Sequence, residues 1–287
     1  MFERALVSLD LSPATEALVS ATPGLRDLGT QEIILSHVAP PLREPVSAHL
    51  DEVRRLKERL EPLGQRLIEK GFDVTVEVPS GSPVTEILRL AEKHEPDFIV
   101  VGSRSHTRIR EAFVGSVAWD LVRRARCPVL LQRIEPNRPD PEAALETRSG
   151  GLPRKILHPT DFSETAVRAI PRLRALANLG VPEITLLHVL PTEGAGVRDE
   201  ALNRLEAIAA DLRSEGGPEV KTQVRLGTPW EEILNSGGRN SDAMVVMGSQ
   251  GRGFLPEIVM GSVSRQVVRR ASSQVLIVPS PPAGSTS

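Results

Sequence analysis

The chain has 287 residues, of which 40% are hydrophobic and 25% charged, and its formal net charge is −2. This length allows one large domain or two of ordinary size, and the composition is typical of a soluble globular protein. The near-neutral charge does not favour nucleic acid or an anionic membrane surface as a partner, and the scarcity of aromatic residues, with no Tyr, argues against a base-stacking platform.

Short apolar runs alternate with amphipathic stretches through the first half of the chain. The runs predict strands at 4–9, 32–38, 73–78, 97–101 and 128–132, and the stretches between them predict helices at 13–28, 46–70, 83–94 and 115–125. The strands are continuous Val, Ile and Leu runs, which is typical of a parallel sheet buried on both faces. Because parallel strands connect through right-handed crossovers, we expect a doubly wound α/β sheet.

A proline-rich stretch separates this half from a second one. Residues 135–153 contain four prolines and predict an exposed linker, because proline interrupts both helices and strands. Beyond it, strands are expected at 155–159, 183–189, 219–225, 243–247 and 274–278, with helices between them. We therefore expect one domain at residues 1–134 and a second at 154–280.

The second half repeats the first. His37 and His188 end equivalent strands 151 positions apart, whereas Gly81 and Gly227 are 146 positions apart. The second spacing persists to the last strands, so one net deletion of five residues accounts for the change. A repeat of this length indicates duplication of a whole domain rather than a solenoid.

Cys127 is the single cysteine, which excludes an internal disulfide and favours a reducing compartment. The N-terminal residues do not combine a basic region with an apolar run, and no apolar stretch reaches about 18 residues. We therefore expect a cytoplasmic protein with no signal peptide and no membrane span.

Glycines after the fourth strand of each half indicate a phosphate site. The second half reads Gly248-x-x-Gly251, nine residues, then Gly261-Ser262, and the first half has Gly102, Ser105 and Gly115-Ser116 at the equivalent positions. Glycine lets the backbone approach a phosphate, and a helix that starts at Gly-Ser presents free N–H groups and the positive end of its dipole. Each feature alone is also explained by a turn or a helix start. It is their combination that indicates a phosphate site.

An aspartate follows the first strand of each half, at Asp10 and Asp161. If the first and fourth strands are neighbours, the loop with the aspartate and the loop with the glycines flank one crevice beyond the strand ends, where doubly wound sheets bind ligands. The carboxylate would accept hydrogen bonds from a sugar or a base.

This pattern resembles the nucleotide-binding class of the universal stress protein family. That family's mark is Gly, two residues, Gly, nine residues, then Gly-Ser or Gly-Thr, which the second half matches without departure. The family's opening Pro-Thr-Asp-Phe-Ser is matched by Pro159–Ser163, and its Leu-His-Val strand end by Leu187–Val189. The resemblance covers both halves and implies a tandem, two-domain member.

The resemblance implies a Rossmann-like fold of two five-stranded, mostly parallel sheets with strand order 3-2-1-4-5. It further implies that the halves form an intramolecular pseudo-dimer, with residues 128–132 paired to 274–278, and it leaves a homodimer of two chains open. The implied ligand is ATP, with or without Mg²⁺, and no protein-bound metal is expected.

The resemblance also assigns binding residues. Asp161 and Val189 would hold the adenosine, and the residues around the ribose and phosphates would be Gly248, Gly251, Arg252, Gly261, Ser262 and Val263. The same site includes Pro159, Thr160 and Met247. A weaker set in the first half consists of Asp10, Val38, Gly102, Gly115, Ser116 and Val117.

The first half departs from the family pattern at Ser105, which replaces the middle glycine. If the backbone there requires a positive φ, serine costs about 1–2 kcal/mol, or roughly tenfold in affinity. We therefore expect the first site to be weak or empty, although Arg104, Arg108 and Arg110 could compensate electrostatically.

The sequence contains no P-loop, no dinucleotide-binding fingerprint, no histidine pair at metal-ligand spacing and no nucleophile with an adjacent base. We therefore expect a stress-response regulatory protein that binds ATP in its C-terminal half, is not an enzyme and hydrolyses ATP slowly at most. The alternative is an interaction scaffold of the same fold, in which the glycines only shape loops. A true ATP-using enzyme is a third interpretation, which lacks a catalytic constellation.

Overall fold

The computed structural model describes residues 1–42, 45–105, 112–136, 145–147, 151–192, 194, 196–240, 242–251 and 260–280. The N-terminal half consists of β1 (Arg4–Ser8), α1 (Ala14–Ala21), η1 (Thr22–Leu28), β2 (Glu32–Ser36), α2 (Val46–Glu69), β3 (Asp73–Glu77), α3 (Pro83–His94), β4 (Phe98–Ser105), β5 (Ala112–Phe113), α4 (Ser116–Arg124), β6 (Val129–Pro136) and β7 (Leu145–Thr147). The C-terminal half consists of β8 (Lys155–Pro159), α5 (Glu164–Val167), α6 (Ile170–Asn178), β9 (Glu183–Leu190), α7 (Val197–Leu212), β10 (Glu219–Leu226), α8 (Pro229–Ile233), η2 (Leu234–Gly238), β11 (Ala243–Gly248), α9 (Ser262–Arg270) and β12 (Gln274–Val278).

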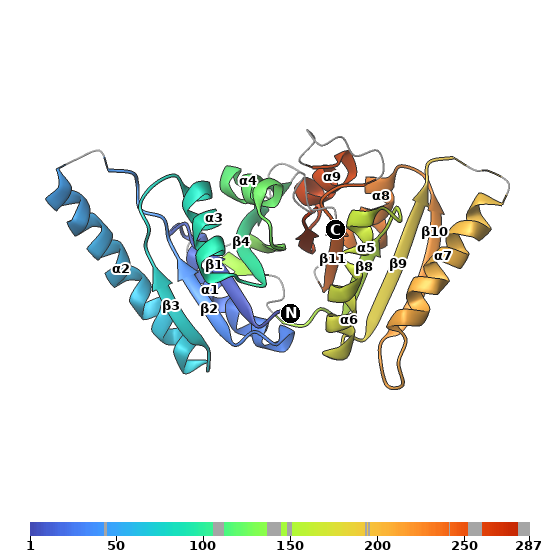
Figure 1. Cartoon of the computed structure of the whole chain (residues 1–287), viewed down its shortest axis with the longest axis horizontal. Helices are drawn as coiled ribbons and strands as arrows, with labels where there is room; N and C mark the ends of the chain where they lie inside the picture. The colour runs from blue at the N-terminus through green and yellow to red at the C-terminus, as the bar shows by residue number, and fades with distance from the viewer. Residues whose placement is uncertain are drawn as a thin grey trace.

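The strands form one continuous sheet that runs through both halves (Figure 1). Its order is β10-β9-β8-β11-β12-β6-β4-β1-β2-β3, so each half has the expected order 3-2-1-4-5. Within these two sets of five strands every pairing is parallel. The halves join where β12 pairs antiparallel with β6, with Leu276 opposite Leu130, which confirms the predicted pseudo-dimer.

Helices cover both faces of the sheet because alternate residues of each strand point to opposite sides. Ala5 and Val7 of β1 pack in a core with α1, η1, α2, α6 and α7, whereas Leu6 packs in a second core with α3, α4, α8 and α9. The central strands β11 and β12 are buried along their whole length, and the edge strands β3 and β10 are partly exposed. The observed strands lie within a few residues of the predicted ones.

Two predicted segments differ in the structure. The helix expected at 13–28 is an α-helix only to Ala21 and continues as a 3₁₀ helix, because Pro23 lacks the N–H that the α-helix needs. The linker expected from residue 135 instead begins as sheet: β6 continues to Pro136, and β7 pairs antiparallel with it. Pro136 fits there because it lies at the end of its strand.

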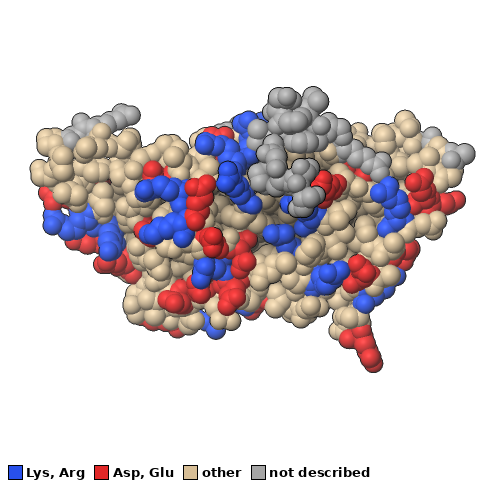
Figure 2. Space-filling model, viewed as in Figure 1, with Lys and Arg blue, Asp and Glu red and all other residues tan. Residues whose placement is uncertain are grey.

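Charged side chains of both signs are interspersed on the face shown in Figure 2. Across the described residues, no helix is both long and apolar enough to span a membrane.

Candidate nucleotide site

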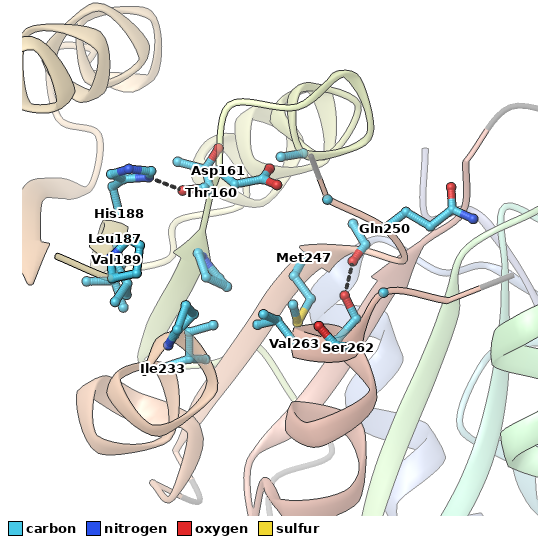
Figure 3. A pocket seen from close by; sticks show the side chains of 18 residues that line it. Thr160, Asp161, Leu187, His188, Val189, Ile233, Met247, Gln250, Ser262 and Val263 are labelled. Atoms are coloured by element: carbon cyan, nitrogen blue, oxygen red, sulfur yellow. Dashed lines mark hydrogen bonds between the residues drawn. The ribbon is translucent and has the colours of Figure 1, made fainter. Parts of the chain in front are cut away.

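A cavity of about 450 Å³ opens at the carboxyl ends of β8, β9 and β11. The strand order reverses here, because β9 lies on one side of β8 and β11 on the other. Doubly wound sheets bind ligands at such a point. Its size is within the range of small-molecule sites. Figure 3 shows the side chains that line it, which are those of Pro159, Thr160, Asp161, Ala166, Leu187, His188, Val189, Pro191, Pro229, Ile233, Met247, Gly248, Gln250, Gly251, Gly261, Ser262, Val263 and Ser264.

One end of the cavity is the N-terminus of α9. Gly261 is the N-cap residue, and no side chain caps the helix there. The first N–H groups of an α-helix have no intrahelical acceptor, so those of this helix are available to an anion. Ser264 Oγ donates to the Gly248 carbonyl at 3.0 Å, which ties the first turn of α9 to the end of β11.

The turn after β8 fixes Asp161 at the cavity. Phe162 is in the left-handed region with φ 60°, and its N–H donates to Thr160 Oγ1 at 3.0 Å. The Ser163 N–H donates to Asp161 Oδ1 at 3.0 Å. His188 Nδ1 donates to the Thr160 carbonyl at 2.7 Å (Figure 3), which links this turn to the end of β9. The Asp161 carboxylate is therefore held by the backbone of its own turn.

The other end of the cavity is apolar. Leu187 and Val189 come from the end of β9, and Pro229 and Ile233 from α8, whereas Met247 of β11 lies nearer α9, beside Val263 (Figure 3). Leu187 and Ile233 are buried, and Val189 and Pro229 are partly exposed. The cavity thus combines a helix N-terminus, one carboxylate and an apolar slot, which suits a ligand with an anionic end and a flat apolar end.

The three motif glycines have different roles. A Cβ on Gly248 would lie 2.8 Å from Thr165 Cγ2 and 3.0 Å from the Thr165 carbonyl oxygen, so helix α5 requires glycine there. A Cβ on Gly251 would collide with the Asp161 carboxylate. A Cβ on Gly261 would meet nothing closer than 3.5 Å, so nothing in the described structure requires glycine at this position.

The structure brings together ten of the eleven residues predicted for this site. They are Pro159, Thr160, Asp161, Val189, Met247, Gly248, Gly251, Gly261, Ser262 and Val263. Arg252 lies outside the described residues. Their role toward a nucleotide stays a prediction. The sequence-based site omitted Ala166, Leu187, His188, Pro191, Pro229, Ile233, Gln250 and Ser264. Of these, Leu187, His188, Pro229 and Ile233 belong to segments that repeat between the halves, and that repetition could have identified them.

The N-terminal half has a smaller cavity of about 270 Å³ at the equivalent place. Five residues of the weaker set line it, namely Asp10, Gly102, Gly115, Ser116 and Val117. Val38 does not line it and packs against the core of α3 and α4 instead. The space beside Gly102 is filled by Ile134, whose Cδ1 would lie 2.6 Å from a Cβ at that position. Of the residues equivalent to Met247 and the apolar end of the C-terminal cavity, only Val101 lines this one, and Val38, Pro83 and Ile87 do not, so this cavity lacks the apolar slot of the C-terminal site.

The backbone after Gly102 also differs from the C-terminal half. β11 ends at Gly248, but β4 continues to Ser105, pairs with β6 through Arg104 and pairs with β5 through Ser105. Main-chain groups in this extension face neighbouring strands rather than a ligand. The condition stated for a cost at Ser105, a positive φ, is not met, because Ser105 is part of a strand. Arg108 and Arg110, predicted to compensate, lie outside the described residues, as does the Arg104 side chain.

The model of the universal stress protein family matches residues 1–133 and matches again at 153–279. The chain belongs to the universal stress protein family. The double match confirms the predicted tandem type.

Individual universal stress proteins are similar to this chain over different lengths. Universal stress protein Rv2005c of Mycobacterium tuberculosis is 25% identical over 275 residues, which are 92% of this chain and 90% of that protein. Universal stress protein MJ0577 of Methanocaldococcus jannaschii is 32% identical over 153 residues, which are 44% of this chain and 94% of that protein. A solved universal stress protein from Archaeoglobus fulgidus DSM 4304 has a TM-score of 0.77, with 24% identity, over 97% of this chain and 99% of its own. This last likeness shows the shared fold.

Proposed function

We propose that this universal stress protein is an ATP-binding regulatory protein that holds its nucleotide in the C-terminal cavity. The observation that carries the proposal is the arrangement of that cavity, with an uncapped helix N-terminus at one end and an apolar slot at the other. The phosphates would lie against the first turn of α9, where N–H groups and the helix dipole favour anions. The adenine would lie between Val189 and Ile233, and Asp161 would accept from the ribose hydroxyls.

We further propose that the protein is not an efficient enzyme. Among the described residues that line the cavity, Asp161 is the only carboxylate, and it already accepts from the Ser163 N–H. His188 is the only histidine there, and its Nδ1 is bonded to the Thr160 carbonyl. No lysine lines the described cavity to neutralise phosphate charge. If ATP is hydrolysed slowly, the bound state lasts long enough for the protein to signal through its conformation that nucleotide is bound.

The proposal places the nucleotide mainly in one half, within the domain boundaries expected from the sequence. The equivalent N-terminal cavity is smaller, and its apolar slot is missing. The single cysteine fits a reducing compartment such as the cytoplasm, and burial raises the pKa of the Cys127 thiol to about 11, which disfavours the reactive thiolate.

Identification of the small molecule that the purified protein carries tests this function. The full chain is denatured and the released compounds are separated by HPLC. We expect ATP or ADP, with conversion of added ATP in Mg²⁺ no faster than minutes to hours. If no nucleotide is released and added ATP does not bind, the scaffold interpretation replaces this one, and rapid conversion would instead indicate an ATP-using enzyme.

A further inference from the structure

Arg133 of β6 is a buried cation at the junction between the two halves. It is only 1% exposed, and burial lowers the pKa of its guanidinium to about 10, so it stays charged at neutral pH. Its three hydrogen bonds go to uncharged acceptors, and no carboxylate among the described residues pairs with it. A buried charge without a carboxylate partner is costly unless it is hydrogen-bonded. The fold therefore depends on the positions of these three acceptors.

Two of the three acceptors belong to the other half of the chain. Arg133 Nη2 donates to the Val268 carbonyl at 2.6 Å, and Nε donates to the Ser273 carbonyl at 3.3 Å. The third, Ser103 Oγ at 3.0 Å, lies on β4 of the N-terminal half. The guanidinium therefore bridges the halves, with Val268 in the last turn of α9 as its shortest contact.

Arg133 completes the C-terminal end of α9. The last carbonyls of a helix have no intrahelical donor. The Ser272 N–H, which would be the donor to Val268 in a longer helix, donates to the Gly238 carbonyl at 2.8 Å instead. Arg133 supplies the missing donor, and its positive charge lies at the negative end of the helix dipole.

The opposite end of the same helix borders the candidate nucleotide site. Gly261, Ser262, Val263 and Ser264 line the cavity, and α9 is nine residues or about 13 Å long. A helix held at its C-terminal end cannot slide or tilt freely, so its N–H groups keep their direction toward the cavity. The buried positive charge of Arg133 also adds to the field that attracts an anion at the far end.

The N-terminal half has no reciprocal contact of this kind among the described residues. The spacing of 146 residues between the halves places Pro279 at the position equivalent to Arg133, and proline has no side-chain donor. The helix equivalent to α9 is α4, so only the half with the larger cavity receives a buried cation from its neighbour.

We propose that Arg133 is a positioning residue through which the N-terminal half holds α9 for binding of the nucleotide phosphates in the C-terminal half. This inference rests on the proposed function. In this interpretation the N-terminal half, whose own cavity is smaller, holds the phosphate-binding helix of the C-terminal half in place.

Binding of ATP and of adenosine to the full chain separates this role from a general structural one. For Arg133→Met we expect ATP affinity to fall about tenfold in calorimetry, while adenosine affinity changes less than twofold. The difference arises because adenosine would contact β8, β9 and α8, which Arg133 does not touch. Leu60→Ala in α2 is the matched control: Leu60 is fully buried in the N-terminal half, so this variant is destabilised without disturbing α9, and its ATP affinity should not change.

Hydrogen exchange provides a readout that does not depend on nucleotide. In Arg133→Lys, a single ammonium replaces the planar fork, and the amides of 265–268 in α9 should exchange at least fivefold faster than in the wild type, with those of β10 unchanged. This variant also serves if Arg133→Met does not fold. Unchanged exchange in α9, or equal losses of ATP and adenosine affinity, would overturn the role of Arg133 while the proposed function stands. A wild-type chain that binds no ATP would overturn both.

Discussion

Replacement of Gly261 by valine is expected to lower ATP affinity about a hundredfold, which corresponds to about 2.7 kcal/mol of binding free energy. The variant should still fold. Gly261 has φ −65° and ψ 154°, a backbone conformation that valine adopts readily. Its Cβ would point toward the backbone of Gln250 and Gly251 at 3.5 Å, and the valine methyl groups would occupy the space between that loop and the α9 N-terminus. The phosphates could then no longer reach the helix N–H groups.

Gly115→Val is the matched control, because Gly115 is the N-cap residue of α4 with φ −57° and ψ 152°, and a Cβ at this position would have no atom within 4 Å. Both variants lose a favourable N-cap residue, at a cost of about 1 kcal/mol each, so thermal unfolding should show similar small shifts. Calorimetry should then give wild-type ATP affinity for Gly115→Val only. Similar ATP affinities for the two variants would show that α9 does not bind the phosphates.

Acid is expected to destabilise the protein through His158, by about 2 kcal/mol at pH 5 and about 3 kcal/mol near pH 4. His158 of β8 is fully buried, and burial lowers its pKa from 6.5 to about 4. Its Nδ1 lies 2.8 Å from the Val246 carbonyl, and its Nε2 has no partner among the described residues. Between pH 6.5 and 4 the unfolded chain therefore binds a proton that the folded chain does not, so stability falls as the pH falls through this window.

His158→Val removes this dependence, and Val7 already occupies the equivalent position of β1 in the N-terminal half. Urea unfolding at several pH values should show a flatter curve for the variant between pH 6.5 and 4. Glu183 does not confound the comparison: a hydrogen bond from Lys221 is the main cause that lowers its pKa to about 2, so its contribution is lost only below pH 4.5 and in both proteins. Parallel curves for the two proteins above pH 4.5 would contradict the prediction.

Most of the fold follows from local patterns in the sequence. The strands are apolar runs buried on both faces, and the constant spacing of motifs on either side of one deletion shows where each element recurs. Gly71 and Gly180 follow the ends of helices and have the left-handed conformation, with φ 88° and 92°, that glycine favours at such positions. These features depend on the chemistry of one segment at a time, which is why sequence alone predicts them.

The features that the sequence did not predict depend on contacts between distant segments. β4 continues past Gly102 because an extension of β6 and the short strand β5 are there to pair with it, and neither partner is visible in the pattern of residues 103–105. A Cβ at Gly251 would collide with the carboxylate of Asp161, 90 positions away, and the backbone of Gly251 does not have the positive φ that favours glycine. The two halves thus diverge through tertiary contacts, although their local patterns are alike.

The number of ATP molecules bound per chain tests whether the C-terminal cavity is the nucleotide site of this protein. Titration of the full chain with ATP and Mg²⁺ by calorimetry should give one molecule per chain, and Gly261→Val should weaken that binding about a hundredfold while Gly115→Val preserves it. Two equivalent sites per chain, or no binding to the wild type, would contradict an ATP site built only around the N-terminus of α9.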